Sequence, residues 1–548
     1  MLRPTVRQIR APVNSPLPPL ILALFVRAGH SKGEIEPLFA FFSGFLLTLT
    51  YRVSICLTVS ARLPTLHKTA FVLDPRPLEE ATSPHAGLLA ISRVYRSLRV
   101  PALVAANLHL RKRQRGHPEA EMIESTVLLQ ALGGECPEDI SLLAGDACLE
   151  RGLGYRPPKA TALREFLELF HQKDLEKLRP SREDQKSFIF PPSAPIQALT
   201  AVQDGAVARI SRLYEKRGQV QRIATIDQDA TIIESHKAAA LWHYEGGRGY
   251  QPMVAVWAEL DLVVADEFRD GNVPAKQDPL TCAKAAFAAL PSTVQQRYFR
   301  GDSACHENEL LGWLKHPDRA KEPGGPIHFA VSAVMSQPLA AALRQVGEQE
   351  WKTFGREEDG TLRQWAEVDF VPGEPSEHKD SKPLRYVGLR LLKPQGVLFQ
   401  DGTDRHYHGV ATNQEKLDGG KLLDWHREKA GTVEHTHDEV KNELGGGHVP
   451  SQRFGVNTAW FKLALLTYNL VSAIKGLALD EEEERTARMK RFRLLVIHVA
   501  GRMNRNNCVM SLRLCHNRPA MARMQRIWEV FELPTQATSA KALGVRSG

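Results

Sequence analysis

The succession of strand and helix patterns between residues 223 and 314 constrains the fold of this 548-residue chain more than any other feature. Apolar runs with the period of strands cover Ile223 to Asp227, Pro252 to Leu260 and Leu262 to Phe268, and a tight turn joins the last two. A helical pattern from Ala283 to Ala289, a strand around Arg297 to Arg300 and a leucine-rich helix follow. This order predicts an α/β fold built on a mixed sheet that is flanked by helices.

Helical patterns precede this region. From Ser83 to about Gln172 the apolar residues recur with helical spacing, which predicts a small domain of short helices. A basic run within it consists of Arg111, Lys112, Arg113 and Arg115. Such a run is ordinarily a solvated loop, and the alternative is a patch that contacts DNA phosphates.

The patterns change again after the predicted sheet. Short apolar alternations between about 316 and 400, separated by proline and glycine clusters, predict a mostly β insertion. A long helical pattern then runs from Leu422 to Leu444, although Gly431 weakens the case for one unbroken helix. A second helix, Asn457 to Leu477, is apolar nearly all round, so we expect it to be buried against the sheet.

The first 72 residues contain two apolar stretches, Leu17 to Val26 and Leu38 to Leu57. The second stretch approaches the roughly 20 residues that span a bilayer. Arg52 opposes a membrane helix, because a charge at its centre costs about 2.5 to 3.5 kcal/mol. We therefore expect an extension that is not organised with the rest of the chain, and we expect no membrane partner. A membrane anchor is the competing hypothesis.

Charge and cysteine content narrow the function classes. A formal net charge of +8 and a pI of 9.0 favour a polyanionic partner. Seven scattered cysteines without a Cys-x-x-Cys pair argue against a disulfide framework and a structural zinc site. His435 and His437 are interpreted as surface residues rather than zinc ligands. A reducing, cytoplasmic compartment fits this composition best.

Isolated acids stand where predicted strands end. Asp227 and Asp229 close the first strand, and the period of two points both to the same face. Asp302 stands where a later strand gives way to a helix. Cleavage of a phosphodiester bond requires an activated nucleophile and a stabilised leaving oxygen, which two magnesium ions held by carboxylates supply. These acids are therefore candidate metal ligands, with either Asp227 or Asp229 as the first.

Several motifs occur in a specific order along the chain: LLQALGGECPEDISLLAGD, TALREFLELF, the strand end IDQDAT, YEGGRGYQP from Tyr244, RDGN from Arg269, RGDSACHENELLGWL from Arg300 and FGVNTAWFKLALLTYNL from Phe454. By these motifs, residues 73 to 531 resemble DDE transposases of bacterial insertion sequences. The resemblance implies a ribonuclease-H-like catalytic domain that a β insertion interrupts before the helix carrying the third acid.

The resemblance implies Glu434 as the third acid, because it stands seven positions before Lys441 and so matches the Glu-x6-Lys spacing of the family. The family commonly has tyrosine and arginine upstream of this glutamate, where this chain has Arg427 and Ala430. Arg427 or Lys429 is a substitute from nearby, and the departure leaves Glu439 and Glu428 as alternative third acids.

Lys441 has two interpretations. If Glu434 faces the sheet, Lys441 lies about two turns along the same side and holds a DNA phosphate. The alternative is an exposed helix lysine paired with Asp438. Spacing alone does not choose between them.

The resemblance also implies a function. It predicts a transposase that binds terminal inverted repeats of double-stranded DNA as a homodimer. Asp229, Asp302 and Glu434 would hold Mg²⁺, with Mn²⁺ as a substitute, for DNA cleavage and strand transfer. A ribonuclease-H-like nuclease without strand transfer and a catalytically inactive DNA-binding relic are the alternatives.

The predicted parts of the chain follow from these patterns. They are an N-terminal extension (1–72), a helical DNA-binding domain (73–215), the first part of the catalytic domain (216–315), a β-rich insertion (316–400), the second part of the catalytic domain (401–478) and a C-terminal region (479–548).

Overall fold

The computed structural model describes Asp74 and residues 80–111, 116–181, 183–184, 186–372, 383–506 and 509–533. The chain divides into two units, Met1–Pro75 and Arg76–Gly548, and the fold below belongs to the second. Both apolar N-terminal stretches, and Lys112, Arg113 and Arg115 of the basic run, lie outside the described residues. Among the residues described, no helix is both long and apolar enough to cross a membrane.

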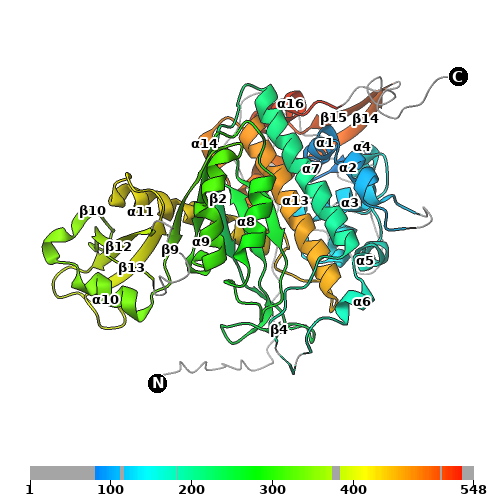
Figure 1. Ribbon diagram of the computed structural model, residues 1–548. Helices are drawn as coiled ribbons and strands as arrows, with labels where there is room; N and C mark the ends of the chain where they lie inside the picture. The colour runs from blue at the N-terminus through cyan, green and yellow to red at the C-terminus, as the bar shows by residue number, and fades with distance from the viewer. Residues whose placement is uncertain are drawn as a thin grey trace, which may run out of the picture. The chain divides into compact units, whose positions relative to one another are not determined.

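A nine-stranded mixed sheet runs through the second unit (Figure 1), in the order β10-β11-β12-β13-β9-β8-β2-β6-β7. The first three strands in sequence form an antiparallel meander, and β8 and β9 then pair in parallel beside β2. The order β7-β6-β2-β8-β9 is the ribonuclease-H-like arrangement, so the predicted fold class is confirmed. The strands are β2 (Ile223–Ala230), β6 (Met253–Trp257), β7 (Leu262–Glu267), β8 (Gln296–Gly301), β9 (Ile327–Ser332), β10 (Lys352–Arg356), β11 (Leu362–Val368), β12 (Arg385–Leu392) and β13 (Arg405–Thr412).

Helices cover both faces of this sheet. Gln228 points from β2 toward α8 (Pro279–Ala288), where its Nε2 donates to the Pro279 carbonyl at 2.8 Å. Asp227, one position earlier, points to the opposite face, beside α11 (Gly419–Arg427) and α12 (Val433–Asn442). The alternation of side chains along β2 therefore separates a packing face from a face that carries acids.

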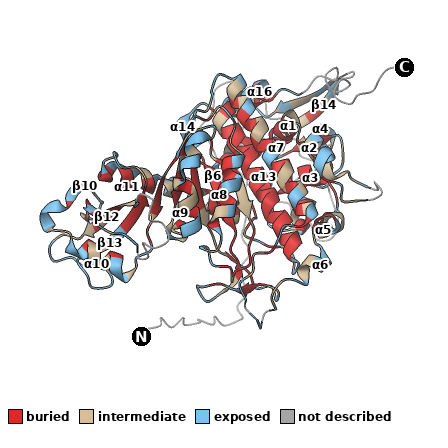
Figure 2. Ribbon diagram, viewed as in Figure 1, coloured by how far each residue is buried: buried red, intermediate tan, exposed pale blue. Residues whose placement is uncertain are grey.

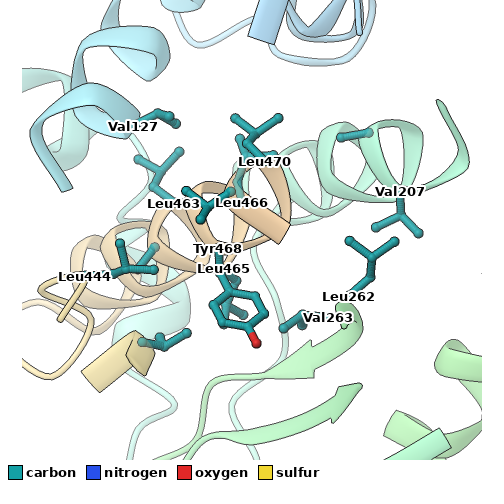
Figure 3. Packing of buried hydrophobic residues seen from close by; sticks show 14 of the residues in the cluster. Val127, Val207, Leu262, Val263, Leu444, Leu463, Leu465, Leu466, Tyr468 and Leu470 are labelled. Carbon is teal, nitrogen blue, oxygen red and sulfur yellow. The ribbon is translucent and has the colours of Figure 1, made fainter. Parts of the chain in front are cut away.

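The long helix α13 (Phe454–Ala478) is the centre of the core. Nearly all of its residues are buried (Figure 2), including Leu463, Leu465 and Leu466 (Figure 3). Asn469 from this helix bonds both the N–H and the carbonyl of Val263 at 2.8 Å, which satisfies backbone groups of the edge strand β7. The expectation of a buried helix against the sheet is confirmed.

The N-terminal helices share this core. Apolar side chains of α1, α3 and α5 pack against α13 in one continuous hydrophobic cluster, and α7 lies beside α13 (Figure 1). These helices are α1 (Leu88–Ser97), α2 (Val100–Asn107), α3 (Glu119–Leu132), α4 (Ala147–Leu153), α5 (Ala160–Glu168), α6 (Lys173–Glu176) and α7 (Ala194–Lys216).

Two smaller sheets complete the fold, in the orders β3-β5-β4 and β1-β14-β15. Their strands are β1 (Thr82–Ser83), β3 (Ile233–Glu234), β4 (Leu241–Trp242), β5 (Arg248–Tyr250), β14 (Gly501–Asn506) and β15 (Val509–Leu514). The remaining α-helices are α9 (Asn308–Lys315), α10 (Gln337–Gln345), α14 (Glu482–Arg485), α15 (Met489–Phe492) and α16 (Arg518–Val530).

The residues assigned to the β insertion continue the main sheet. β9 lies within the span 316–400 and pairs in parallel with β8, and β13, β12, β11 and β10 extend the sheet beyond it by antiparallel pairing. The boundaries drawn from the sequence at 215, 315, 400 and 478 stay predictions.

The long helix expected from Leu422 to Leu444 is broken, so that prediction is wrong. α11 ends at Arg427, a 3-10 turn covers Glu428–Gly431, and α12 begins only at Val433. Thr432 between them is not helical, with φ −118° and ψ −89°, and its hydroxyl donates to the buried carboxylate of Asp227. A tertiary contact therefore outweighs the local helical pattern.

Candidate functional site

Two acids meet at the carboxyl ends of β2 and β8. Parallel pairing sets Gln228 beside Gly301, so the residues that follow them, Asp229 and Asp302, are neighbours. Burial and the negative charge of Asp302 raise the pKa of Asp229 to about 7. Burial also raises the pKa of Asp302, although its carboxylate accepts a hydrogen bond from the Ala304 N–H at 3.0 Å. The two carboxylates thus form a partly buried acidic pair.

Glu434 joins this pair from the first turn of α12. Its side chain is 50% exposed, and its Oε1 accepts a hydrogen bond from Lys429 Nζ at 3.1 Å. Burial opposes the charge of Lys429, yet the charge of Asp229, the hydrogen bond to Glu434 and the charge of Asp302 raise the pKa of this lysine overall. The ammonium group of Lys429 therefore interacts with all three acids, and the three gather around one cation.

Asp227 has a different environment. It is fully buried, and Arg300 on β8 holds it with two hydrogen bonds, of 2.6 Å from Nε to Oδ1 and 2.8 Å from Nη2 to Oδ2. The hydroxyl of Thr432 also donates to Oδ2. Both carboxylate oxygens are therefore engaged by the protein, and Asp229, two residues on, is the acid of this strand that faces Asp302.

The alternative third acids are engaged elsewhere. Glu428 accepts a hydrogen bond from Nη1 of Arg300 at 2.8 Å. Glu439 is buried and accepts one from the Met489 N–H at 2.9 Å. Arg427, offered as a substitute for the family's arginine, donates to Glu357 at 2.6 Å instead. The positive charge at the acids comes from Lys429, the other residue that the sequence suggested.

Lys441 lies beside the strand end. Its Nζ donates to the hydroxyl of Thr231 at 3.1 Å, two residues after Asp229, and the side chain is half-buried. Burial lowers the pKa of this lysine. Asp438, its proposed partner, forms an ion pair with Arg488. This position suits contact with a phosphate group near the acids.

His437 does not lie on the surface, contrary to the expectation. It is buried on α12, and burial lowers its pKa to about 3, so the ring is neutral. Its Nε2 has no hydrogen-bond partner among the described residues. His435 is partly exposed and lies 3.3 Å from Glu439. Within the described ranges, no group of three histidine, cysteine or acidic side chains is arranged to hold a metal ion.

The basic run of the N-terminal helices is only partly described. Arg111 donates from Nη1 to the His117 carbonyl at 3.2 Å. The other three members, Lys112, Arg113 and Arg115, lie outside the described residues.

Sequence reasoning missed Arg300 and Thr432 as the residues that hold Asp227. One signal was present, because Arg300 stands within a predicted strand of the sheet, and an arginine is almost never fully buried unless it is paired. The partner could not be read from the sequence, since Asp227 lies 73 residues away.

The strand order and the acids at the ends of two parallel strands define a ribonuclease-H-like protein of the DDE class. A family model described as "Transposase DDE domain group 1" matches residues 79–534. The chain belongs to this transposase family.

The chain was also compared with solved structures and with curated proteins. A solved structure, described as the cryo-EM structure of piggyBac transposase synaptic complex with hairpin DNA, is similar over 84% of this chain and 83% of that chain. The sequence identity is 10% and the TM-score is 0.39. A search of curated proteins gave no match.

Proposed function

We propose that this chain is the transposase of a bacterial insertion sequence, which binds the terminal inverted repeats of its element, cuts the DNA and joins it to a target. The observation that carries the proposal is the gathering of Asp229, Asp302 and Glu434 around Lys429 at the carboxyl ends of two parallel strands. Fixed acids at strand ends are what metal-assisted phosphodiester chemistry requires.

The chemistry of the donor set, though not its arrangement among the described residues, fits Mg²⁺, with Mn²⁺ as a substitute. The three side chains offer only carboxylate oxygens, which are the ligands that magnesium prefers. Their combined charge exceeds that of the one lysine beside them, and burial together with the negative charge of Asp302 raises the pKa of Asp229. Asp229, Asp302 and Glu434 would hold the ions, which activate the attacking hydroxyl and stabilise the leaving oxygen.

Other residues of the chain would support this chemistry. Arg300 and Thr432 hold Asp227 rigidly and so fix the strand on which Asp229 stands. Lys441, bonded to Thr231, would position a DNA phosphate. The N-terminal helices, with Arg111, Lys112, Arg113 and Arg115, would bind the repeats in a homodimer located in the cytoplasm.

The test is Mg²⁺-dependent cleavage of a duplex that carries the element's flanking repeats, with wild type beside Asp302→Asn and Glu434→Gln. We expect both variants to lose on the order of 10³-fold in rate, about 4 kcal/mol of activation free energy. The matched control is Glu428→Gln, a substitution of the same kind six residues from Glu434.

Other outcomes would change the proposal. Loss of cleavage in Glu428→Gln but not in Glu434→Gln would identify Glu428 as the third metal ligand. Cutting without joining would identify a nuclease, and specific binding without cutting by the wild type would identify an inactive relic.

A further inference from the structure

Positive charge is concentrated near the C-terminus. Between Thr486 and Trp528 the sequence contains ten arginine and lysine residues and no acidic residue, against a formal net charge of +8 for the whole chain. The rest of the chain therefore carries slightly more acidic than basic side chains. Part of this segment forms strands β14 and β15, which lie beside α4 (Figure 1) in a sheet separate from the acids.

The two faces of the β1-β14-β15 sheet differ in character. Met503 points inward and is buried. Among the side chains that the structure describes, those on the opposite face are hydrogen-bonding ones, because the register sets Thr82 beside Arg502, Arg502 beside Arg513, and Asn504 beside Ser511. We call this the donor face. Five polar side chains on three adjacent strands form a continuous polar surface.

The charges of this region are incompletely balanced within the protein. Arg502 pairs with Glu80. Arg513 on the donor face and Arg518 at the start of α16 are exposed and have no acidic partner within the described part of the chain. Arg505 also has none there, but it follows Met503 by two positions and so lies on the other face of the ribbon. Like charges directly opposite each other on neighbouring strands are destabilising, as Arg502 and Arg513 are here. A bound anion would remove this cost.

We infer that the donor face, together with Arg518, binds the phosphate backbone of duplex DNA outside the catalytic site. The inference rests on the proposed function for the identity of the polyanion. Arginine, asparagine, serine and threonine side chains are the groups that contact phosphates, and a β-ribbon is one of the elements that dock on a duplex. This surface would hold DNA in register while the acids cut elsewhere.

The experiment measures binding of a duplex of arbitrary sequence, about 40 base pairs long, without divalent ions and over a range of salt concentrations. The ribbon variant is Arg502→Gln/Arg513→Gln/Arg518→Gln. We expect its logarithmic salt slope to fall by about 2 to 3, with an affinity loss on the order of 100-fold at 0.1 M salt. Conversely, Ser511→Lys should steepen the slope.

The matched control removes three charges from exposed residues outside this sheet, in Arg344→Gln/Arg356→Gln/Lys416→Gln. Thermal unfolding checks that both triple variants fold. The inference is supported if the salt slope falls in the ribbon variant and keeps its wild-type value in the control. It is overturned if the slope falls equally in both variants or falls in neither variant. Unchanged DNA binding with altered self-association of the ribbon variant also overturns it, because the surface would then be a protein interface. If the wild type binds no duplex, the proposed function fails as well, so the two failures are distinguishable.

Discussion

Arg300 and Asp227 form a buried ion pair across neighbouring parallel strands, with two hydrogen bonds between them. A third donor of the same arginine reaches Glu428 and the Trp425 carbonyl. The pair joins the strand that carries Asp229 to the turn that carries Lys429. The Arg300–Asp227 pair therefore fixes the relative position of these two segments of the acidic site without being part of that site.

Replacement of Arg300 should be severe. Arg300→Gln would leave the carboxylate of Asp227 buried without its charged partner, which costs about 3 to 5 kcal/mol in the free energy of unfolding. Urea denaturation followed by circular dichroism measures this cost. Arg405→Gln, which removes a partly exposed arginine that pairs with Asp404 and Glu348, is the control and should change stability little. Equal effects of the two substitutions would contradict the structural role of Arg300.

The ionisation of Asp229 should remove stability from the metal-free protein as the pH rises from about 4 to about 7. Asp229 stays protonated up to about pH 7 in the folded state, whereas the unfolded chain releases this proton near pH 4. A raised carboxyl pKa thus favours folding at low pH. At pH 8 the ionisation of Asp229 lowers the free energy of unfolding, relative to low pH, by an amount on the order of 4 kcal/mol.

Asp229→Asn isolates this effect. The variant should be more stable than the wild type at pH 8, with a difference that shrinks toward pH 4. His437 acts in the opposite direction below about pH 6.5, because its pKa is lowered, but it contributes equally to both proteins. A difference that does not vary with pH would show that Asp229 ionises normally.

Lys429 should compete with divalent cations. Its ammonium group compensates the charge of Asp229, Asp302 and Glu434 in the ion-free protein. In Lys429→Met the acids repel each other without compensation, so Mg²⁺ or Mn²⁺ should raise the melting temperature more than in the wild type. The control is Lys441→Met, which removes a lysine that donates to Thr231 instead. A smaller shift in Lys429→Met would mean that the lysine helps to assemble the ion site.

Leu466→Ala should destabilise the fold by about 2 to 5 kcal/mol, because this side chain is fully buried in the α13 core shown in Figure 3. Leu494→Ala makes the same chemical change at a side chain that is 71% exposed, and its effect should stay within about 0.5 kcal/mol. Chemical denaturation of both variants gives the comparison. Similar values would show that α13 is not packed as described.

Much of the fold was predictable because the signals are local. The meander β2, β6 and β7 follows from runs of apolar residues, and so do β8 and the helices α8 and α13. The break between α11 and α12 was not predictable in the same way. Gly431 is a local signal against one unbroken helix, but the bond from the Thr432 hydroxyl to Asp227, which accompanies the break, joins residues far apart in the sequence.

The sequence by itself determined the strands, the helices and the acids at strand ends, because side-chain period and turn residues act over a few positions. It could not decide between Asp227 and Asp229, since both point to the same face of one strand, and it favoured Asp229 only because the Asp-x-Thr signature starts there. The tertiary structure gives the two carboxylates different surroundings. Arg300, distant in sequence, pairs with Asp227, while the parallel register brings Asp302 beside Asp229. Contacts between residues far apart in the chain therefore decide which of the two carboxylates is paired with an arginine, because burial and pairing depend on neighbours that only the folded chain supplies.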